Sequence, residues 1–188
     1  MKQQELLKSA NDCALKIMES VLDVEFFKEP YSHCVIDNFF PPAFAQQLFS
    51  GFPPLESEDW ERTNDPEIEV KLRSAWKSEF DIPDDILPAI RILNSSMILK
   101  AMASRFEISK LVPDPYFTGG GLNVMVSGGL LDVHVDGNYH DATGLNRRIN
   151  ALVYLNPKWE KGWGGEFGIY DSKGEPLIKK VEPIFNRL

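Results

Sequence analysis

The order of two hydrophobic patterns along the chain restricts the folds that it can adopt. Up to about residue 110, apolar residues recur mainly at the spacing of an α-helix. After residue 120, short β-rich runs are separated by Gly, Asn, Asp and Pro, without helical segments between them. Helices followed by strands predict an α+β fold in which helices pack on one face of a mainly antiparallel sheet. Many short strands favour a jelly roll or sandwich over a parallel sheet.

The helical part divides into segments with recognisable limits. We predict an amphipathic helix over residues 3–23, a strand over 33–40, a helix over 41–51 and a long helix over 84–106. Residues 55–82 are polar and aromatic and predict a loop with one short strand or helix near 68–76. No linker separates two units, so the sequence predicts one domain.

Composition excludes several classes of function. The net charge of −8 argues against binding to a phosphate backbone, so we expect no nucleic acid partner. No apolar run approaches the length of a membrane span, and no signal sequence follows Met1, so we expect no membrane partner and a cytoplasmic location. The two cysteines, Cys13 and Cys34, lack the spacing of a metal motif, and we expect reduced thiols.

Two potential metal ligands lie close together in the β-rich part. His134 and Asp136 are two residues apart in the run "LLDVHVD", so on a strand their side chains would share one face with Asp132. An imidazole and a carboxylate so placed can occupy adjacent corners of an octahedral metal site. Taken alone, the pair favours a structural or solvated polar contact over a metal site. Gly128 and Gly129 precede it, as expected where a ligand or another backbone approaches closely.

The residues that follow form an ordered series. His134-Val135-Asp136 is followed by "RRINALVYLN" at 147–156, by Trp159 and by "GGEF" at 164–167. This series resembles the core of the iron(II)- and 2-oxoglutarate-dependent dioxygenases, and most closely the prolyl-4-hydroxylase-like branch. "VEPIFNRL" and "YSHCVIDNFFPPAFAQQLF" are similar to further elements of that branch. The resemblance covers residues 121–188 well and 31–50 loosely.

The resemblance implies a fold, cofactors and a reaction. It implies a double-stranded β-helix (a jelly roll) within one domain, 1–188. Residues 1–110 would supply helices packed on the major sheet and a lead-in strand, and 111–188 the first part of the catalytic jelly roll. His134 and Asp136 would bind Fe(II), 2-oxoglutarate would be the co-substrate, and ascorbate is a candidate third cofactor. The implied activity is hydroxylation of a C–H bond with dioxygen, on a peptidyl prolyl residue or a small molecule, with 2-oxoglutarate decarboxylated to succinate.

Further positions carry over from the resemblance. Tyr154 matches a tyrosine that contacts the distal carboxylate of 2-oxoglutarate, although a core tyrosine is an equal alternative. Asn150 shares the strand face of Tyr154 and would add a polar wall to the co-substrate site. Met125 replaces a tyrosine found in many relatives. Asp132 is interpreted as a rim charge, and His140 as a loop or substrate-side histidine. His33 is interpreted as structural, and Trp159 and Trp163 as packing residues around the Gly164-Gly165 turn.

The family pattern is incomplete in this sequence. Relatives take a third ligand from a distal histidine and pair the co-substrate with a later arginine or lysine, but no histidine follows His140. Arg187 matches a different basic position and is not assigned to the co-substrate. We therefore expect a C-terminally incomplete version of a longer dioxygenase. The alternatives are an inactive jelly-roll module that binds a metal or small molecule, and an interaction protein built on the helix at 3–23.

Overall fold

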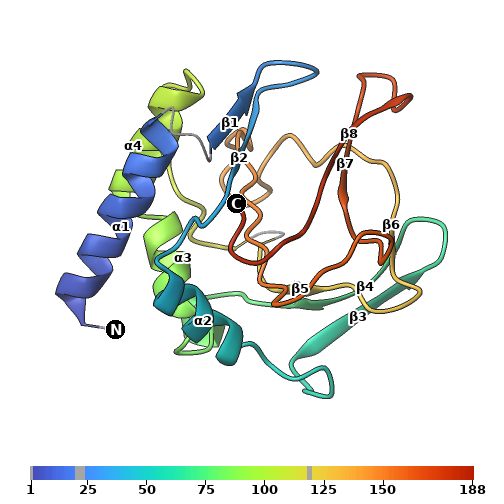
Figure 1. Ribbon diagram of the computed structural model, residues 1–188, viewed down its shortest axis with the longest axis horizontal. Coiled ribbons are helices and arrows are strands. Elements are labelled where there is room, and N and C mark those ends of the chain that lie inside the picture. The colour runs from blue at the N-terminus through green and yellow to red at the C-terminus, as the bar shows by residue number, and fades with distance from the viewer. Residues whose placement is uncertain (1, 20–23, 118–119) are drawn as a thin grey trace.

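The computed structural model describes residues 2–19, 24–117 and 120–188, and its helices gather on one side of the molecule (Figure 1). This helical layer contains α1 (Gln3–Met18), α2 (Pro42–Ser50), α3 (Leu87–Leu93) and α4 (Ser96–Arg105), with a 3₁₀ turn, η1 (Glu79–Asp81), ahead of α3. The short strands lie on the other side, and the C-terminus ends beside β2 (His33–Ile36). There the backbones of Ile36 and Leu188 exchange two hydrogen bonds, of 2.9 and 3.0 Å.

The helices confirm the sequence-based positions with two differences in extent. α1 ends at Met18, before the predicted limit, and residues 20–23 of the predicted helix lie outside the described part of the chain. The predicted helix over 84–106 is two helices, because the Ser95 hydroxyl caps α4 by accepting a hydrogen bond from the Ile98 N–H at 3.4 Å. Within the described residues, no helix combines the length and apolar character needed to cross a bilayer.

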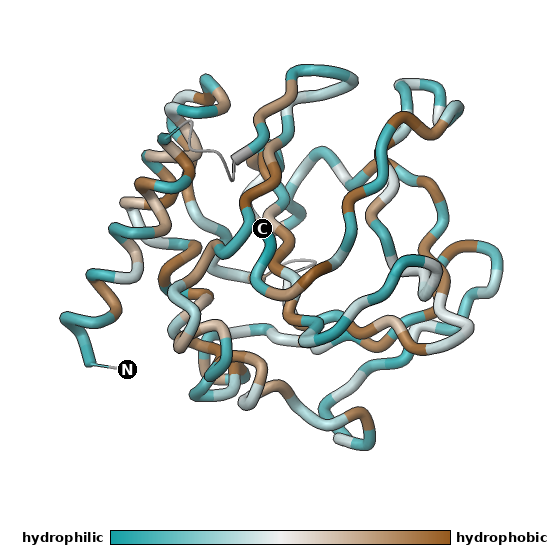
Figure 2. Tube along the Cα trace, viewed as in Figure 1, coloured by the Kyte–Doolittle hydropathy of each residue, from teal (hydrophilic) through white to brown (hydrophobic). Residues whose placement is uncertain are grey.

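The main core lies between the helices and β2. Ile36 and the aromatic pair Phe39 and Phe40 are fully buried there, and the rings of Phe40 and Phe44 meet edge to face at 5.1 Å. In Figure 2 the hydrophobic residues of the chain concentrate where the helices face this strand. Partly buried residues from the C-terminal half complete the core: Ile149, Val153, Leu155, Phe185 and Leu188.

In the described part of the chain, three small sheets form the β side, and their strand pairings are antiparallel, as predicted. β1 (Val24–Phe27) pairs with β2. β4 (Glu69–Ser74) pairs with β3 (Trp60–Asp65) on one side and with β5 (Asn123–Val124) and β6 (Leu130–Leu131) on the other. β7 (Phe167–Tyr170) pairs with β8 (Leu177–Val181). The sheets remain separate among the described residues, so the double-stranded β-helix stays a prediction.

Three strand predictions were too long, and the first of them, over 33–40, ends at Ile36. The run at 130–136 is a strand only over β6, and the run at 147–156 contributes a single β-bridge, between Tyr154 and Arg187. A strand persists only where a neighbouring backbone satisfies its N–H and C=O groups. Past β6, the last such contact is the hydrogen bond from the Asp132 N–H to the Ile68 carbonyl, 2.9 Å long.

Candidate functional site

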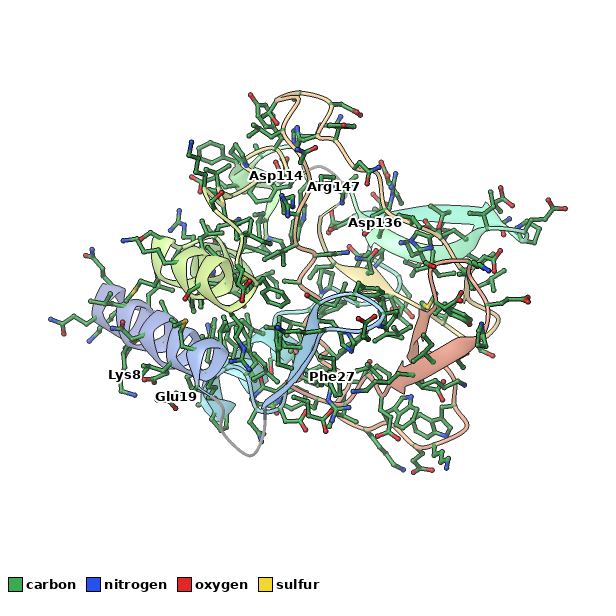
Figure 3. The ribbon with its side chains drawn as sticks, turned by 90° about the horizontal axis from the view of Figure 1, so that it is seen from above. Lys8, Glu19, Phe27, Asp114, Asp136 and Arg147 are labelled. Atoms are coloured by element: carbon green, nitrogen blue, oxygen red, sulfur yellow. The ribbon has the colours of Figure 1, made fainter. Side chains whose placement is uncertain are left out.

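The β3–β4 hairpin supports the segment that carries the His134 and Asp136 pair. β4 pairs with β6 in the register Val70 to Leu130 and Glu69 to Leu131. His134 follows this pairing after three residues, and Asp136 lies beside the hairpin in Figure 3. The region 55–82, predicted as a loop with one short element, therefore supplies a two-stranded support for the candidate ligands.

Gly129 makes the close approach of these two segments possible. A Cβ atom on Gly129 would lie 2.8 Å from the Val126 carbonyl oxygen and 3.1 Å from that of Val70. Both are backbone atoms that cannot turn aside, so any side chain here would push β6 away from β4. Gly128 has a φ of +82°, which favours glycine. The expectation that a neighbouring backbone approaches closely here is confirmed for Gly129, whereas a Cβ atom on Gly128 would meet nothing within 4 Å.

His134 and Asp136 turn unpaired acceptors toward each other. His134 Nδ1 lies 2.7 Å from the Asp132 carbonyl oxygen, which can only accept a hydrogen bond, so Nδ1 carries the proton. In the neutral imidazole, the Nε2 lone pair is then free. Nε2 lies 3.6 Å from Asp136 Oδ1, too far for a hydrogen bond. A cation placed between these two atoms would be coordinated by both.

Asn150 holds the other oxygen of the same carboxylate. Its side-chain amide donates to Asp136 Oδ2 at 3.1 Å, which orients the carboxylate and leaves Oδ1 directed at His134. The His134 and Asp136 side chains are 47% and 50% exposed, so a metal ion and a ligand can reach them from solvent. The sequence placed Asn150 beside the co-substrate. The structure instead brings it to the candidate metal site.

The apolar residues between the candidate ligands are not covered. On a strand, Val133 and Val135 would face away from the candidate ligands and be covered by the core or another layer, but in the described structure they are not covered. Val135 is 90% exposed and Val133 46% exposed. Beyond β6 no neighbouring strand fixes the pleat, so burial does not determine which way the segment faces.

Tyr154 lies on the same chain segment as Asn150 but contacts the C-terminal residues. Val153 and Leu155, on either side of Tyr154, pack on the main core. The Tyr154 backbone donates to the Arg187 carbonyl at 2.8 Å and accepts from the Asn186 N–H at 2.7 Å. Burial raises the pKa of Tyr154 to about 12, while the nearby Arg187 charge opposes that rise. The phenol is therefore a neutral hydrogen-bond donor at physiological pH.

Arg187 is engaged by a carboxylate of the lead-in strand. Its Nε and Nη2 atoms donate to Asp37 Oδ1 and Oδ2 at 2.6 and 2.9 Å, and Nη1 donates to the Glu182 carbonyl at 3.0 Å. The Asp37 carboxylate raises the pKa of Arg187 further. This pair borders a groove of about 380 Å³, in which Lys179 and Lys180 are paired with Glu25 and Glu166. The cations of this groove are largely neutralised, which agrees with leaving Arg187 unassigned to the co-substrate.

His140 holds a loop together. Its Nδ1 accepts hydrogen bonds from the Ala142 and Thr143 N–H groups at 3.2 Å, so Nε2 carries the proton and donates to Asp114 Oδ1 at 2.9 Å. The residue is 6% exposed, and its ring lies 5.4 Å from that of Tyr116. Both nitrogens are therefore occupied. The geometry supports the interpretation as a loop histidine and disfavours a substrate-side role.

The structure supports the roles assigned to Trp159 and His33 and corrects the role assigned to Trp163. The Trp159 indole N–H donates to the Gly164 carbonyl at 2.9 Å, so Trp159 does support that turn. Trp163 does not pack there, because it is 60% exposed with Lys158 Nζ 5.6 Å from its ring centroid. The ring of His33 stacks on Phe27 at 4.8 Å, in agreement with a structural role.

A third protein ligand is not found in the described part of the chain. No three or more His, Cys, Asp or Glu side chains there converge as a metal site would require. The donors that are present fit Fe(II), since an imidazole and a carboxylate suit this metal, but they supply two of three expected ligands. Sequence reasoning missed Asn150 as a neighbour of the metal ligands.

Comparison with known proteins supports the resemblance in the C-terminal region. Residues 120–188 match the sequence model of the 2OG-Fe(II) oxygenase superfamily, and this region is less than half of the chain. It contains both candidate ligands and the Tyr154 segment. No curated protein matches the sequence. The match supports the 2OG-Fe(II) oxygenases as the family to which residues 120–188 are related, with Fe(II) and 2-oxoglutarate as the implied cofactors.

Proposed function

We propose that this chain is the oxygenase domain of an Fe(II)- and 2-oxoglutarate-dependent hydroxylase, with His134 and Asp136 as metal ligands. The observation that carries the proposal is the 3.6 Å approach of His134 Nε2 and Asp136 Oδ1, two donor atoms on solvent-exposed side chains. At right angles on one metal, with bonds of about 2.1 Å, two such donors would lie about 3 Å apart, so a small adjustment brings them into register. Bound Fe(II) would supply dioxygen activation and a chelating position for 2-oxoglutarate.

The chain's own residues would orient these groups. The Asp132 carbonyl fixes the His134 tautomer, and the Asn150 amide fixes the Asp136 carboxylate, which is the support that metal ligands commonly require. The phenol of Tyr154, like any tyrosine at neutral pH, carries its proton and can donate a hydrogen bond to a carboxylate of the co-substrate. With two protein ligands, we expect metal affinity to be modest and to increase when 2-oxoglutarate is added, because the co-substrate provides further donor atoms.

We further propose a peptidyl prolyl residue as the first substrate to test. The prolyl-4-hydroxylase-like order of motifs supports it, and so does the open position of the candidate ligands, which an extended peptide can reach. Tyr139 is 66% exposed three residues after Asp136, and its ring offers an apolar face to a proline side chain. A small-molecule substrate is the alternative.

Succinate formation from 2-oxoglutarate in the presence of Fe(II) tests the proposed activity. Wild type and His134→Ala are compared with and without a Pro-containing peptide, and with and without ascorbate. Oxygen insertion into the peptide, read as the mass of one added oxygen atom, is expected for the Pro peptide and not for its Ala counterpart. Binding of the metal and 2-oxoglutarate without formation of succinate would indicate a binding module and not an enzyme. Absence of both would reject the proposal.

A further inference from the structure

A small hairpin, residues 138–147, begins two residues after the candidate ligand Asp136. Its ends are joined by the Arg147 N–H, which donates to the Asn138 carbonyl at 2.8 Å. Two further backbone hydrogen bonds, of 2.8 and 2.9 Å, close its tip, and the buried side chain of His140 anchors it. The backbone therefore fixes where Arg147 begins relative to Asp136.

The Arg147 guanidinium lies against the backbone that follows Asp136. A Cβ atom on Gly137 would be 3.9 Å from Arg147 Nη1, which is an ordinary van der Waals contact. Consecutive Cα atoms are about 3.8 Å apart, so the guanidinium lies roughly one residue away from the candidate metal ligand. Figure 3 shows Arg147 and Asp136 near each other, in agreement with this contact. A positive charge thus borders the candidate site.

Within the described part of the chain, no carboxylate forms an ion pair with Arg147. In contrast, Arg73, Arg91 and Arg187 each have a carboxylate oxygen close by, at 3.1, 3.5 and 2.6 Å. The carboxylate of Asp136 is near, but one of its oxygens is occupied by an amide and the other is directed at the candidate metal position. Arg147 is exposed, so its N–H donors are open to a ligand that arrives from solvent.

We propose that Arg147 is a specificity-determining residue that binds a carboxylate of the substrate. The inference rests on the proposed function, because it takes His134 and Asp136 as the centre at which the substrate reacts. A guanidinium presents a planar pair of N–H donors that matches both oxygens of a carboxylate. An extended peptide advances about 3.3 Å per residue. The preferred peptide therefore carries Asp or Glu within about two residues of the hydroxylated position.

The preference depends on the position of the acidic residue in the peptide. The net charge of the whole chain is −8, so an acidic peptide gains nothing from the protein's overall charge. Charges farther apart than about 8 Å are largely screened at physiological ionic strength. An Asp about five residues from the reacting proline would lie roughly 16 Å away from it, out of reach of Arg147. Such a peptide should bind no more tightly than its Asn counterpart.

Binding of labelled Pro peptides to protein loaded with Mn(II) and 2-oxoglutarate, measured by fluorescence anisotropy without oxygen, tests the proposal. The peptides carry Asp or Asn at one of the two positions on either side of the proline. Wild type should bind the best Asp peptide about fivefold more tightly than its Asn counterpart, and Arg147→Gln should bind both equally. Arg148→Gln, which removes the same charge from an exposed neighbour, should keep the preference. Equal ratios in wild type and Arg147→Gln, or loss of the preference in both variants, would overturn the proposal.

Charge reversal separates substrate binding from a structural role. Arg147→Glu should prefer a Lys peptide over the Asp peptide, whereas damage to the fold would weaken the binding of both alike. The affinity of Mn(II)-loaded Arg147→Gln for 2-oxoglutarate should stay within about twofold of wild type. A loss of tenfold or more would assign the guanidinium to the co-substrate and overturn the proposal.

Failure of the proposed function gives a different result. Wild type would then bind no Mn(II), and the role of Arg147 would fall with the site. Failure of this inference alone would leave Mn(II) binding intact and dependent on His134, with no Asp preference that Arg147→Gln removes.

Discussion

The side-chain amide of Asn186 forms two hydrogen bonds with the backbone of Phe40. Asn186 Oδ1 accepts from the Phe40 N–H at 2.9 Å, and Nδ2 donates to the Phe40 carbonyl at 2.8 Å. Asn186 is 2% exposed and has a φ of +61°, a conformation that Asn tolerates better than most residues. The amide therefore acts as a short piece of β-ladder that fastens the C-terminal segment to the lead-in strand.

Removal of this amide is expected to destabilise the whole domain. Asn186→Ala leaves the N–H and C=O of the buried Phe40 backbone without partners, which should lower the free energy of unfolding by about 2–4 kcal/mol. Urea denaturation followed by circular dichroism measures it. Asn64→Ala is the control, since Asn64 is exposed, and we expect a change within about 0.5 kcal/mol. Equal midpoints for the two variants would show that the amide contact contributes nothing.

Ionisation of Tyr154 should make the free energy of unfolding depend on pH in the alkaline range. Burial raises its pKa to about 12, whereas an unfolded tyrosine ionises near pH 10. A raised folded-state pKa gives stability that is fully present below about pH 10 and is lost as the pH rises toward 12, because the unfolded state ionises first. The difference in unfolding free energy between wild type and Tyr154→Phe should therefore be constant from pH 7 to 9. It should then shift against wild type between pH 10 and 12.

Comparison with the Phe variant is needed because burial also raises the pKa of Cys13 to about 12. Ionisation of the Cys13 thiol destabilises wild type and Tyr154→Phe over an overlapping pH range, so its effect cancels in the difference between their unfolding free energies. A pH-independent difference up to pH 12 would mean that the Tyr154 phenol ionises as freely in the folded protein as in the unfolded chain.

Loss of the His140 side chain should destabilise the loop at 138–147 and leave the metal affinity unchanged. His140→Ala removes the hydrogen bonds to Asp114, Ala142 and Thr143. At about 1 kcal/mol for each lost bond, amide exchange across residues 138–147 should accelerate by at least about tenfold, measured by mass spectrometry. Manganese affinity should stay within about twofold of wild type. A loss of affinity as large as that of His134→Ala would make His140 a ligand after all.

The sequence predicted the helical side more fully than the β side, for a physical reason. α1 and α2 satisfy their own backbones, so a periodic apolar stripe and a stop signal at Gly51 are enough to locate them. The break at Ser95 was missed because its apolar pattern continues across it. β3 was missed because "WERTND" is largely polar and is held by pairing with β4, a contact that no local pattern reports.

The candidate site shows the same division. The motif order predicted His134 and Asp136 as metal ligands, and both remain candidates, while the sequence left Tyr154 open between a core residue and a co-substrate contact. The contact of Asn150 with Asp136 and the exposure of Val135 could not be predicted, because they depend on how irregular segments cross. The shared face of His134 and Asp136 was inferred from a strand, yet it is produced here by hydrogen bonds to Asp132 and Asn150.

The binding of Mn(II), a paramagnetic substitute for Fe(II), measured by electron paramagnetic resonance tests the shared metal site most directly. His134→Ala and Asp136→Asn should each weaken binding by more than about tenfold, because each removes one of two protein donors. Asp132→Asn, the matched change four residues earlier on an exposed side chain, should stay within about twofold. Equal affinity in all four proteins would contradict a metal ion held between His134 and Asp136.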